Sequence, residues 1–280
     1  MGYGRPKLAE FAETIVKAME AGQPVVVATL VGPEDLASGL LGRKVVVADR
    51  SVVSGSLGLD TLDRRVADEA WKALQDRKGA RLFCVSLTAE EAQLLDLKPG
   101  IELRLFIDPL LPPPALLIVG AGHIAQPLSR MGKMLGFLVT VIDDRSDFAN
   151  RERFPEADRV VCGAYDKELR DFPITRSTYI VIVTRGHVHD ELALKTVIAS
   201  EAAYIGMIGS QRRVRGVFSR LRDSGVTEGR LARVYSPIGL DIGAETPAEI
   251  AVSILAEVIN VMRRGEGHPS SLSALKKRVG

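Results

Sequence analysis

The spacing of apolar residues differs between the first and the second part of the chain. In the first part, apolar residues recur every three to four positions over 8–22 and 60–79, which predicts two amphipathic helices. Runs rich in β-branched residues predict strands over 24–32, 44–58, 81–88 and 101–109. The second of these runs contains Asp49 and Arg50 at its centre and therefore predicts a hairpin. Because strands and helices do not alternate regularly, the pattern favours a small α+β domain over residues 1–108.

Three consecutive prolines, Pro112 to Pro114, mark the end of this first part. Such a run forms a stiff, extended spacer, so we expect a linker over residues 109–114. Beyond it the strand-forming runs are apolar throughout rather than alternating, which indicates a parallel sheet that is covered on both faces. These runs lie at 115–119, 138–143, 159–163, 179–184 and 204–209.

Helix-forming segments separate most of these strands. The clearest lie at 190–200, 211–225 and 246–265. The last one begins with Thr246, Pro247 and Glu249, which form a capping box with proline at the first helical position. This order of elements predicts a Rossmann-like, doubly wound α/β domain over residues 115–265, followed by a polar tail over 266–280.

The composition is that of an ordinary globular protein, with 46% hydrophobic residues, 26% charged residues and a net charge of +2. The near balance of 37 basic and 35 acidic residues argues against a nucleic-acid-binding protein, since such proteins usually carry a basic excess. Without a signal peptide or a long apolar run, we expect a cytoplasmic protein that does not insert into a membrane. Cys84 and Cys162 lie in strand-like runs and are expected to be buried free thiols. A homodimer is the commonest symmetric assembly for such a chain.

The first strand of the second domain runs into a glycine-rich turn that matches the pattern G-x-G-x-x-A. In this pattern Gly120 permits a tight turn, Gly122 lets the backbone approach a pyrophosphate, and Ala125 lets the next helix pack on the sheet. The free N–H groups and partial positive charge at the N-terminus of that helix favour an anion. His123 lies within the turn, where it either covers a ligand or is an exposed residue of the helix.

The second strand ends in a pair of acidic residues, Asp143 and Asp144. Asp143 follows Gly120 by 23 residues, at the position from which an acidic residue binds the hydroxyls of a ribose. Together with the turn, it predicts a Rossmann unit that binds a nucleotide-like pyrophosphate. The two carboxylates argue against a ligand with a 2′-phosphate, although the neighbouring Arg145 leaves NADP open as well as NAD.

A second group of polar residues follows the fourth strand, in "TRGHVHD". Ligands bind at the carboxyl ends of the strands in open α/β sheets, so we expect four of these residues at the same crevice as the glycine turn. The four are Thr184, Arg185, Gly186 and His187. Arg185 suits a phosphate. Two alternatives are that His187, His189 and Asp190 hold a metal ion, or that Asp190 caps the helix that follows.

The fifth strand ends in another glycine-rich turn, where Gly209 and Ser210 precede a helix. Ser210 is suited to cap this helix. Arg212 and Arg213 in its first turn indicate either a solvated face or a nearby anion. Together with the loop "SPIGLDIGAETP", these turns suggest a large ligand that carries phosphate.

Taken in order, these segments resemble the XdhC/CoxI family, accessory proteins of xanthine dehydrogenase and related molybdenum hydroxylases. The resemblance rests on "IVGAGHIAQPL", "VTVIDDRSDFANRERFPEADRVV", "TRGHVHD", "YIGMIGSQRR" and "PIGLDIGAETPAEIAVSILAEVI", and more weakly on "RKVVVADRSVVSGSLGLDTLD". It implies a chaperone rather than an enzyme. Such a protein binds molybdenum cofactor, assists its sulfuration by a cysteine desulfurase and delivers it to the apo-hydroxylase. This cofactor is a pterin with a dithiolene and a phosphate, with or without an added nucleotide, and its phosphate end suits a Rossmann crevice.

One segment departs from the family's pattern. Well-studied members carry a cysteine implicated in cofactor binding, in a motif close to "GSISGGCLE". This chain has "GSLGLDTLD" over 55–63, with Thr61 near the expected place, so thiolate ligation of molybdenum from this loop is excluded. Two other functions stay open, an NAD(P)-dependent oxidoreductase and a nucleotide-binding scaffold protein. The oxidoreductase lacks an expected feature, because the first domain holds no histidine that could act as a catalytic acid or base.

Overall fold

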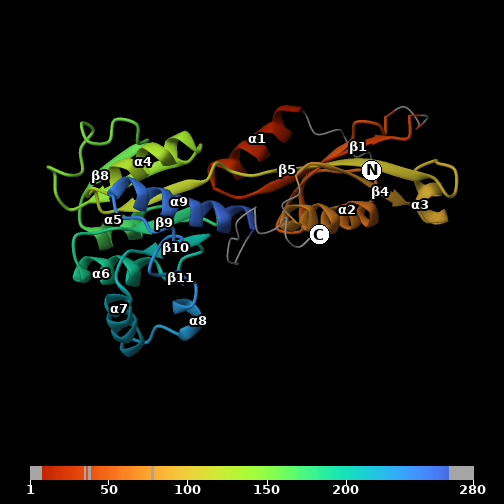
Figure 1. Cartoon of the computed structure of the whole chain (residues 1–280). Helices are drawn as coiled ribbons and strands as arrows, with labels where there is room; N and C mark the ends of the chain where they lie inside the picture. The colour runs from red at the N-terminus through yellow and green to blue at the C-terminus, as the bar shows by residue number, and fades with distance from the viewer. Residues whose placement is uncertain (1–7, 35, 37–38, 77–78, 265–280) are drawn as a thin grey trace, which may run out of the picture. The chain divides into compact units, whose positions relative to one another are not determined.

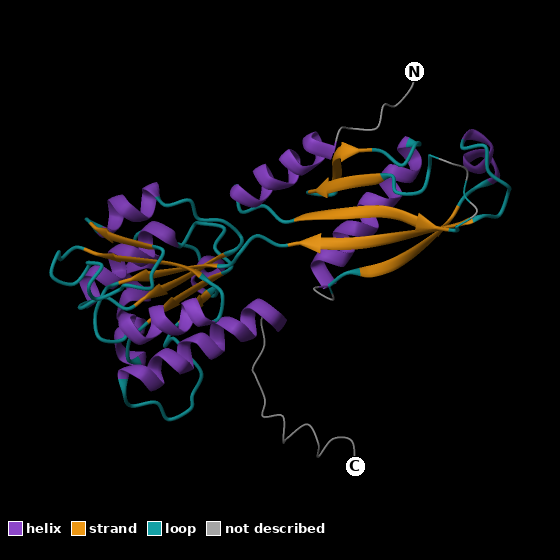
Figure 2. Cartoon of the chain, turned by 90° about the horizontal axis from the view of Figure 1, so that it is seen from above, coloured by secondary structure: helices purple, strands orange, loops and turns teal. Residues whose placement is uncertain are grey.

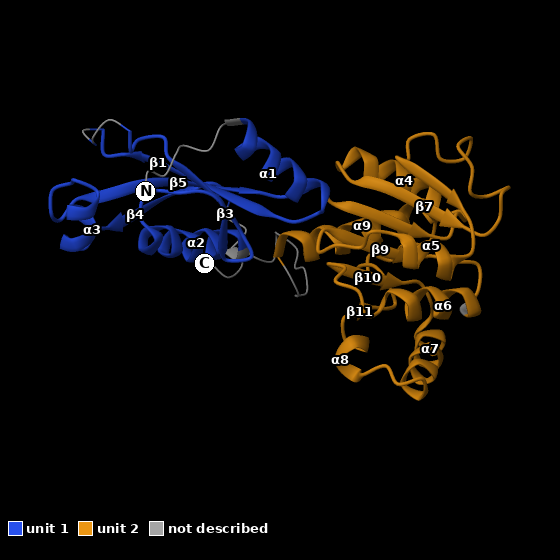
Figure 3. Ribbon diagram, turned by 180° about the vertical axis from the view of Figure 1, so that it is seen from behind, with its two compact units in different colours: residues 1–112 blue, residues 113–280 orange. Residues whose placement is uncertain are grey.

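The chain folds into two compact units, residues 1–112 and 113–280, which are coloured separately in Figure 3. The structure is a computed structural model, and it describes residues 8–264 except 35, 37–38 and 77–78. Each unit has its own hydrophobic core. Among the helices described, none is both long enough and apolar enough to cross a membrane. The tail expected over 266–280 lies outside the described residues.

The first unit is built on an antiparallel sheet, whose strands are drawn as orange arrows in Figure 2. The sheet has five strands in the order β3-β2-β1-β5-β4. Its strands are β1 (Val25–Gly32), β2 (Lys44–Ala48), β3 (Ser51–Gly55), β4 (Arg81–Ser86) and β5 (Glu102–Leu110). α1 (Leu8–Glu20) and α2 (Asp60–Asp76) pack on opposite faces, because alternate residues of β1 and β2 point toward one helix or the other. The short α3 (Ala89–Leu94) connects β4 to β5. The predicted α+β fold of this part is thereby confirmed.

Local backbone geometry accounts for two features of this sheet. The predicted hairpin is present between β2 and β3, where Asp49 and Arg50 both have positive φ, 44° and 64°, as a type I′ turn requires. β5 continues through Leu110, which lies inside the segment expected as a linker. Pro109 is tolerated in this strand because β4 pairs with β5 only as far as Ile107, so one edge of β5 is open beyond that residue.

The second unit contains a six-stranded parallel sheet in the order β11-β10-β9-β6-β7-β8. Its strands are β6 (Ala115–Val119), β7 (Leu138–Asp143), β8 (Arg159–Cys162), β9 (Thr178–Ile182), β10 (Tyr204–Met207) and β11 (Val234–Tyr235). From β8 to β11 the strands of this unit follow the order 3-2-1-4-5-6, which is that of the dinucleotide-binding Rossmann fold. The predicted doubly wound sheet is confirmed.

Helices cover both faces of this sheet (Figure 1). One face carries α4 (Ala125–Met134) and α9 (Pro247–Arg264). The other face carries α5 (Tyr165–Asp171), α6 (His187–Val197), α7 (Gln211–Asp223) and α8 (Glu228–Leu231). α9 begins with the predicted capping box, in which Glu249 accepts a hydrogen bond from the Thr246 N–H at 2.9 Å and donates its own N–H to Thr246 Oγ1 at 3.3 Å.

The two cysteines are free but exposed, so the prediction that they are buried is wrong. Cys84 lies in β4 and Cys162 ends β8, and both of these are edge strands of their sheets. An edge strand has a neighbour on one side only, so an apolar run there does not ensure that each side chain is covered.

Candidate functional site

The strand order of the second unit creates a switch point between β6 and β9. β6 leads to α4 on one face of the sheet, whereas β9 leads to α6 on the other. In open α/β sheets, ligands bind at this point, in the crevice outside the carboxyl ends of the strands. The glycine turn follows β6 and "TRGHVHD" follows β9, so the structure brings together the two segments that the sequence singled out.

Gly120 makes the tight turn that the sequence predicts. Its φ is 107°, and a Cβ atom at this position would lie 2.6 Å from the carbonyl oxygen of Val183. Its N–H donates a hydrogen bond to the carbonyl of Ile142 at 2.7 Å, which ties the turn to β7. Only glycine therefore lets the chain leave β6 so close to the end of β9.

The outer side of the turn is open. A Cβ atom on Gly122 would meet no atom within 4 Å, and His123 is exposed. α4 starts at the buried Ala125 without a side-chain cap. Within the described part of the chain, the N–H groups of Gly122, His123 and Ile124 donate to no protein acceptor. These groups are available to an anion at the positive end of the helix.

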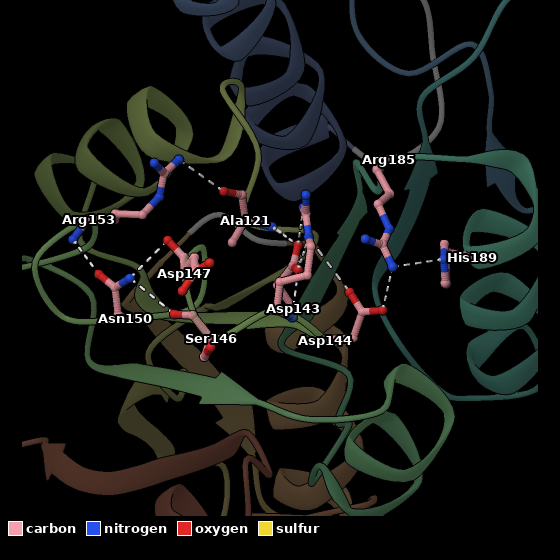
Figure 4. Close-up of polar contacts among 10 residues, drawn as sticks. Ala121, Asp143, Asp144, Ser146, Asp147, Asn150, Arg153, Arg185 and His189 are labelled. Carbon is pink, nitrogen blue, oxygen red and sulfur yellow. Dashed lines mark hydrogen bonds and ion pairs between the residues drawn. The ribbon is translucent and has the colours of Figure 1, made fainter.

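Asp143 is fully buried, and the protein itself supplies hydrogen bonds to both of its carboxylate oxygens (Figure 4). One oxygen accepts from the Ala121 N–H at 2.8 Å and from Arg145 Nη2 at 3.0 Å. The other accepts from the Arg145 N–H at 3.1 Å and from its Nε at 2.8 Å. Burial alone would raise the pKa of Asp143, but these hydrogen bonds together outweigh it and lower the pKa to about 2. The predicted contact with a ribose stays a prediction, and it requires Arg145 to move.

The loop after β7 places two guanidinium groups beside the glycine turn. The guanidinium carbon of Arg145 lies 3.6 Å from the centre of the Phe148 ring, and that of Arg153 lies 4.9 Å from the same centre. Arg153 Nη2 also donates to the carbonyl of Ala121 at 3.4 Å. The Asn150 side chain keeps this loop in shape by bonding two loop carbonyls and the N–H of Arg153 (Figure 4).

Residues that follow β9 contact the end of β7. Arg185 Nη2 lies 2.9 Å from the carboxylate of Asp144 and 3.5 Å from Nε2 of His189. The His189 ring packs edge-on against the ring of the buried Tyr165, with 5.5 Å between the ring centres. Burial, followed by the charges of Asp143 and Asp144, raises the pKa of Tyr165, so this hydroxyl stays neutral. Asp144 and Arg185 thus lie at the same crevice and form an ion pair with each other.

Thr184 and Asp190 form a buried polar pair at the base of "TRGHVHD". The Thr184 hydroxyl donates to Asp190 at 2.5 Å, and a guanidinium nitrogen of Arg213 lies 3.1 Å from the other carboxylate oxygen. Burial raises the pKa of Asp190 in spite of these two partners. α6 begins at His187 with Gly186 as its N-cap. The prediction that Asp190 caps this helix is therefore wrong, because Asp190 lies within the first turn.

The turn after β10 has the predicted cap. Gly209 precedes Ser210, whose hydroxyl accepts a hydrogen bond from the N–H of Arg213 at 3.4 Å. No group of three or more His, Cys, Asp or Glu side chains in the described part of the chain could hold a metal ion. The side chain of His187 lies outside the described residues.

Comparison with known proteins agrees with this architecture. Residues 116–258 match the XdhC Rossmann domain, and residues 18–85 match the XdhC and CoxI family. The chain belongs to the XdhC family. Both matches fall on the segments that carried the resemblance in the sequence, and the longer one contains the glycine turn and "TRGHVHD".

Two relatives and one solved structure are similar to this XdhC family member. The uncharacterized protein YqeB of Escherichia coli (strain K12) is 31% identical over 262 residues, which cover 91% of this chain and 48% of YqeB. A probable xanthine dehydrogenase subunit of Bacillus subtilis (strain 168) is 32% identical over 161 residues, 58% of this chain and 47% of that protein. The chain thus spans about half the length of the curated relatives it matches. The crystal structure of a xanthine dehydrogenase from Bacillus halodurans has the same fold, with a TM-score of 0.50 at 21% identity over 94% of this chain and 98% of that one.

Proposed function

We propose that this protein is an accessory protein of a molybdenum hydroxylase of the xanthine dehydrogenase type, and that it binds molybdenum cofactor through the phosphate of the cofactor. Membership of the XdhC family and the name of the Bacillus subtilis relative support the link to xanthine dehydrogenase. The observation that carries the proposed binding is the open glycine turn at the uncapped N-terminus of α4.

The groups around this turn fit a phosphate. The free N–H groups of the turn and the N-terminus of α4 provide donors and a partial positive charge, and Arg153 adds a guanidinium beside Ala121. Asp143 keeps the turn rigid from behind, through the N–H of Ala121. The cofactor is cargo in this proposal, and the molybdenum chemistry that it supplies belongs to the hydroxylase that receives it.

The first unit contributes no thiolate at the place that the family resemblance indicates. Thr61 lies near that place, in the first turn of α2, and its hydroxyl donates a hydrogen bond to Glu91 at 3.0 Å. The stretch over 55–63 contains no cysteine. The proposal therefore places binding at the phosphate end of the cofactor and involves no bond from this stretch to molybdenum.

The proposal implies two protein partners, the apo-hydroxylase that receives the cofactor and a cysteine desulfurase that sulfurates it. It assigns no catalytic residue to this chain. A cytoplasmic homodimer is part of the same proposal, since the cofactor is delivered to a cytoplasmic enzyme and a two-fold dimer is the commonest assembly.

An NAD(P)-dependent oxidoreductase is the alternative that one observation favours. The strand order and the glycine turn are those of dinucleotide-binding domains. The contacts of Asp143 argue against this alternative, because the carboxylate that would bind the ribose is bonded to Arg145.

The test is to purify the protein from cells that make molybdenum cofactor and to identify what copurifies by mass spectrometry and metal analysis. We expect molybdenum together with a pterin phosphate, lost in Gly122→Asp, because a carboxylate there repels the phosphate. Gly229→Asp is the matched control, since a Cβ atom on Gly229 would also meet no atom within 4 Å and this residue lies in α8, away from the turn. Copurification of NAD or NADP without molybdenum would instead support the oxidoreductase. A protein without ligand that still binds the hydroxylase would support the scaffold function.

A further inference from the structure

The part of the crevice at the end of β7 is filled by the protein's own side chains. In Rossmann folds that bind dinucleotides, the ribose hydroxyls bind the acidic residue at the end of the second strand, which is Asp143 here. Arg145 donates three hydrogen bonds to this carboxylate, and Ala121 donates a fourth. A carboxylate offers about four lone-pair positions, so none is left for a ribose hydroxyl.

Several contacts hold Arg145 in this position, and they include a longer ion pair with Asp144 at 3.8 Å. The guanidinium of Arg145 forms a two-pronged ion pair with Asp143, and it also stacks on the ring of Phe148. Phe148 is partly buried and packs against the core cluster that includes residues of α4, so the core supports the ring beneath the guanidinium. Because Asp143 is fully buried, removing the guanidinium leaves a buried charge short of donors. Ribose hydroxyls are neutral donors and replace a cation poorly, which makes the exchange unfavourable.

A second ion pair crosses the path that a dinucleotide would take. Asp144 follows β7 and Arg185 follows β9, and β6 lies between these two strands. Their contact at 2.9 Å joins the carboxyl ends of the strands on either side of β6 (Figure 4). A dinucleotide that extends from β7 to β9 has to break this pair. An anion on the open side of Gly122 leaves both ion pairs in place.

We propose that Arg145 determines the class of ligand at the glycine turn, so that the site takes a phosphomonoester and excludes the ribose of a dinucleotide. Arg145 does this by occupying the carboxylate of Asp143, and it does not need to touch the phosphate. The inference rests on the proposed function, which it narrows to the form of the cofactor that ends in a phosphate without an added nucleotide.

Isothermal titration calorimetry on the full chain tests this with two probes, 6-hydroxymethylpterin monophosphate and ADP-ribose. We expect the wild type to bind the pterin phosphomonoester at least about tenfold more tightly than ADP-ribose, which corresponds to roughly 1.4 kcal/mol. In Arg145→Ala we expect the affinity for ADP-ribose to rise by about tenfold or more, because the carboxylate becomes free for the ribose. The affinity for the phosphomonoester should change by less than about threefold.

Arg130→Ala is the matched control, since Arg130 is an exposed arginine of α4 whose partner is Glu156. Circular dichroism melts of each variant confirm that it is folded. Equal affinity of the wild type and Arg145→Ala for ADP-ribose overturns the inference. Tight binding of ADP-ribose or NADP by the wild type that Arg145→Ala weakens also overturns it. If Arg145→Ala gains affinity for ADP-ribose while neither protein binds the pterin, Arg145 does exclude the ribose and the proposed function is wrong.

Discussion

Asp144 and Arg185 form an ion pair at 2.9 Å although they follow strands that are not neighbours in the sheet. Their side chains are 26% and 46% exposed, so the pair adds little to stability, typically less than about 1 kcal/mol. Its consequence lies in binding, because the carboxylate of Asp144 competes with any anion for the guanidinium of Arg185.

Removing this competition should strengthen the binding of a phosphate. In Asp144→Asn, Arg185 is free to turn toward the ligand, and we expect the affinity for a pterin phosphomonoester to rise by about threefold, less than about 1 kcal/mol. Arg185→Ala should lower that affinity, and both changes should shrink at high salt because the pair is exposed. Calorimetry at low and high salt measures this. Unchanged affinity in both variants would show that Arg185 takes no part in binding.

Asp143 should make the protein sensitive to acid. At pH 7 we expect Asp143→Asn to lower the free energy of unfolding by about 3 kcal/mol. The reason is that the guanidinium of Arg145 loses the buried carboxylate that neutralises its charge. The folded pKa of about 2 lies below the ordinary value of 3.8. The contribution of the carboxylate is therefore complete above about pH 4 and is lost as the pH falls toward about 2.

Urea unfolding of the wild type and Asp143→Asn at several pH values between 7 and 2 tests this prediction. Asp166→Asn is the control, since its ion pair with Arg170 is a surface pair between neighbouring turns of α5. The difference between wild type and Asp143→Asn should narrow below about pH 4. A difference that stays constant down to pH 2 would mean that folding does not lower the pKa of Asp143.

The main features of the second unit could be predicted because they are local in the sequence. Uninterrupted apolar runs identify the buried parallel strands, and the spacing of Gly120 and Gly122 identifies the turn between β6 and α4.

The short helices of both units could not be predicted. The helices α3, α5 and α8 are only 6, 7 and 4 residues long, which is too short to show a helical period.

The contacts within the crevice could not be predicted in the same way. Asp143 and Arg145 are close in the sequence, but their two-pronged pair depends on burial of the carboxylate and on the Phe148 ring that supports the guanidinium. Phe148 and Arg153 were not predicted to lie at the site, although the run of charged residues in "DDRSDFANRER" could have indicated it. The pairing of Asp190 with Arg213 joins α6 to α7, which no pattern within one helix reveals.

Asp190 and Arg213 should depend on each other for stability. Arg213→Met leaves a buried carboxylate without its cation, and we expect a loss of about 2 kcal/mol, below the usual range because Arg213 is 35% exposed. The double variant with Asp190→Asn should recover most of this loss, since a neutral amide needs no counter-charge. Because the pKa of Asp190 is raised, Arg213→Met should lose stability as the pH rises from about 4 to 7.

Chemical unfolding of the wild type, both single variants and the double variant at pH 4 and pH 7 provides the double-mutant cycle. Arg220→Met is the control, since Arg220 pairs with the partly exposed Glu191 on the same helix pair. If the losses of the two single variants simply add in the double variant, the two residues are not coupled and the contact does not matter for stability.

Substitutions at the two glycines of the turn should affect different properties: the change at Gly120 should lower stability, and the change at Gly122 should lower affinity. In Gly120→Ala, the new methyl group meets the carbonyl of Val183 at a φ of 107°, and we expect the protein to lose about 3 kcal/mol. In Gly122→Ala, the methyl group enters open space, so stability should change by less than about 0.5 kcal/mol.

The affinity for a phosphate should show the opposite order. Among variants that remain folded, the change at Gly122 should weaken binding more than the change at Gly120. The methyl group of Gly122→Ala stands where a phosphate approaches the N–H groups of the turn, so we expect the affinity for a pterin phosphomonoester to fall by about tenfold. Gly229→Ala is the control, because a methyl group there also enters open space but lies in α8. Thermal melts and calorimetry on the same preparations measure both quantities. If Gly122→Ala binds as tightly as Gly229→Ala, the phosphate does not bind at the outer side of the turn, because a group in van der Waals contact with that backbone could not tolerate the added carbon.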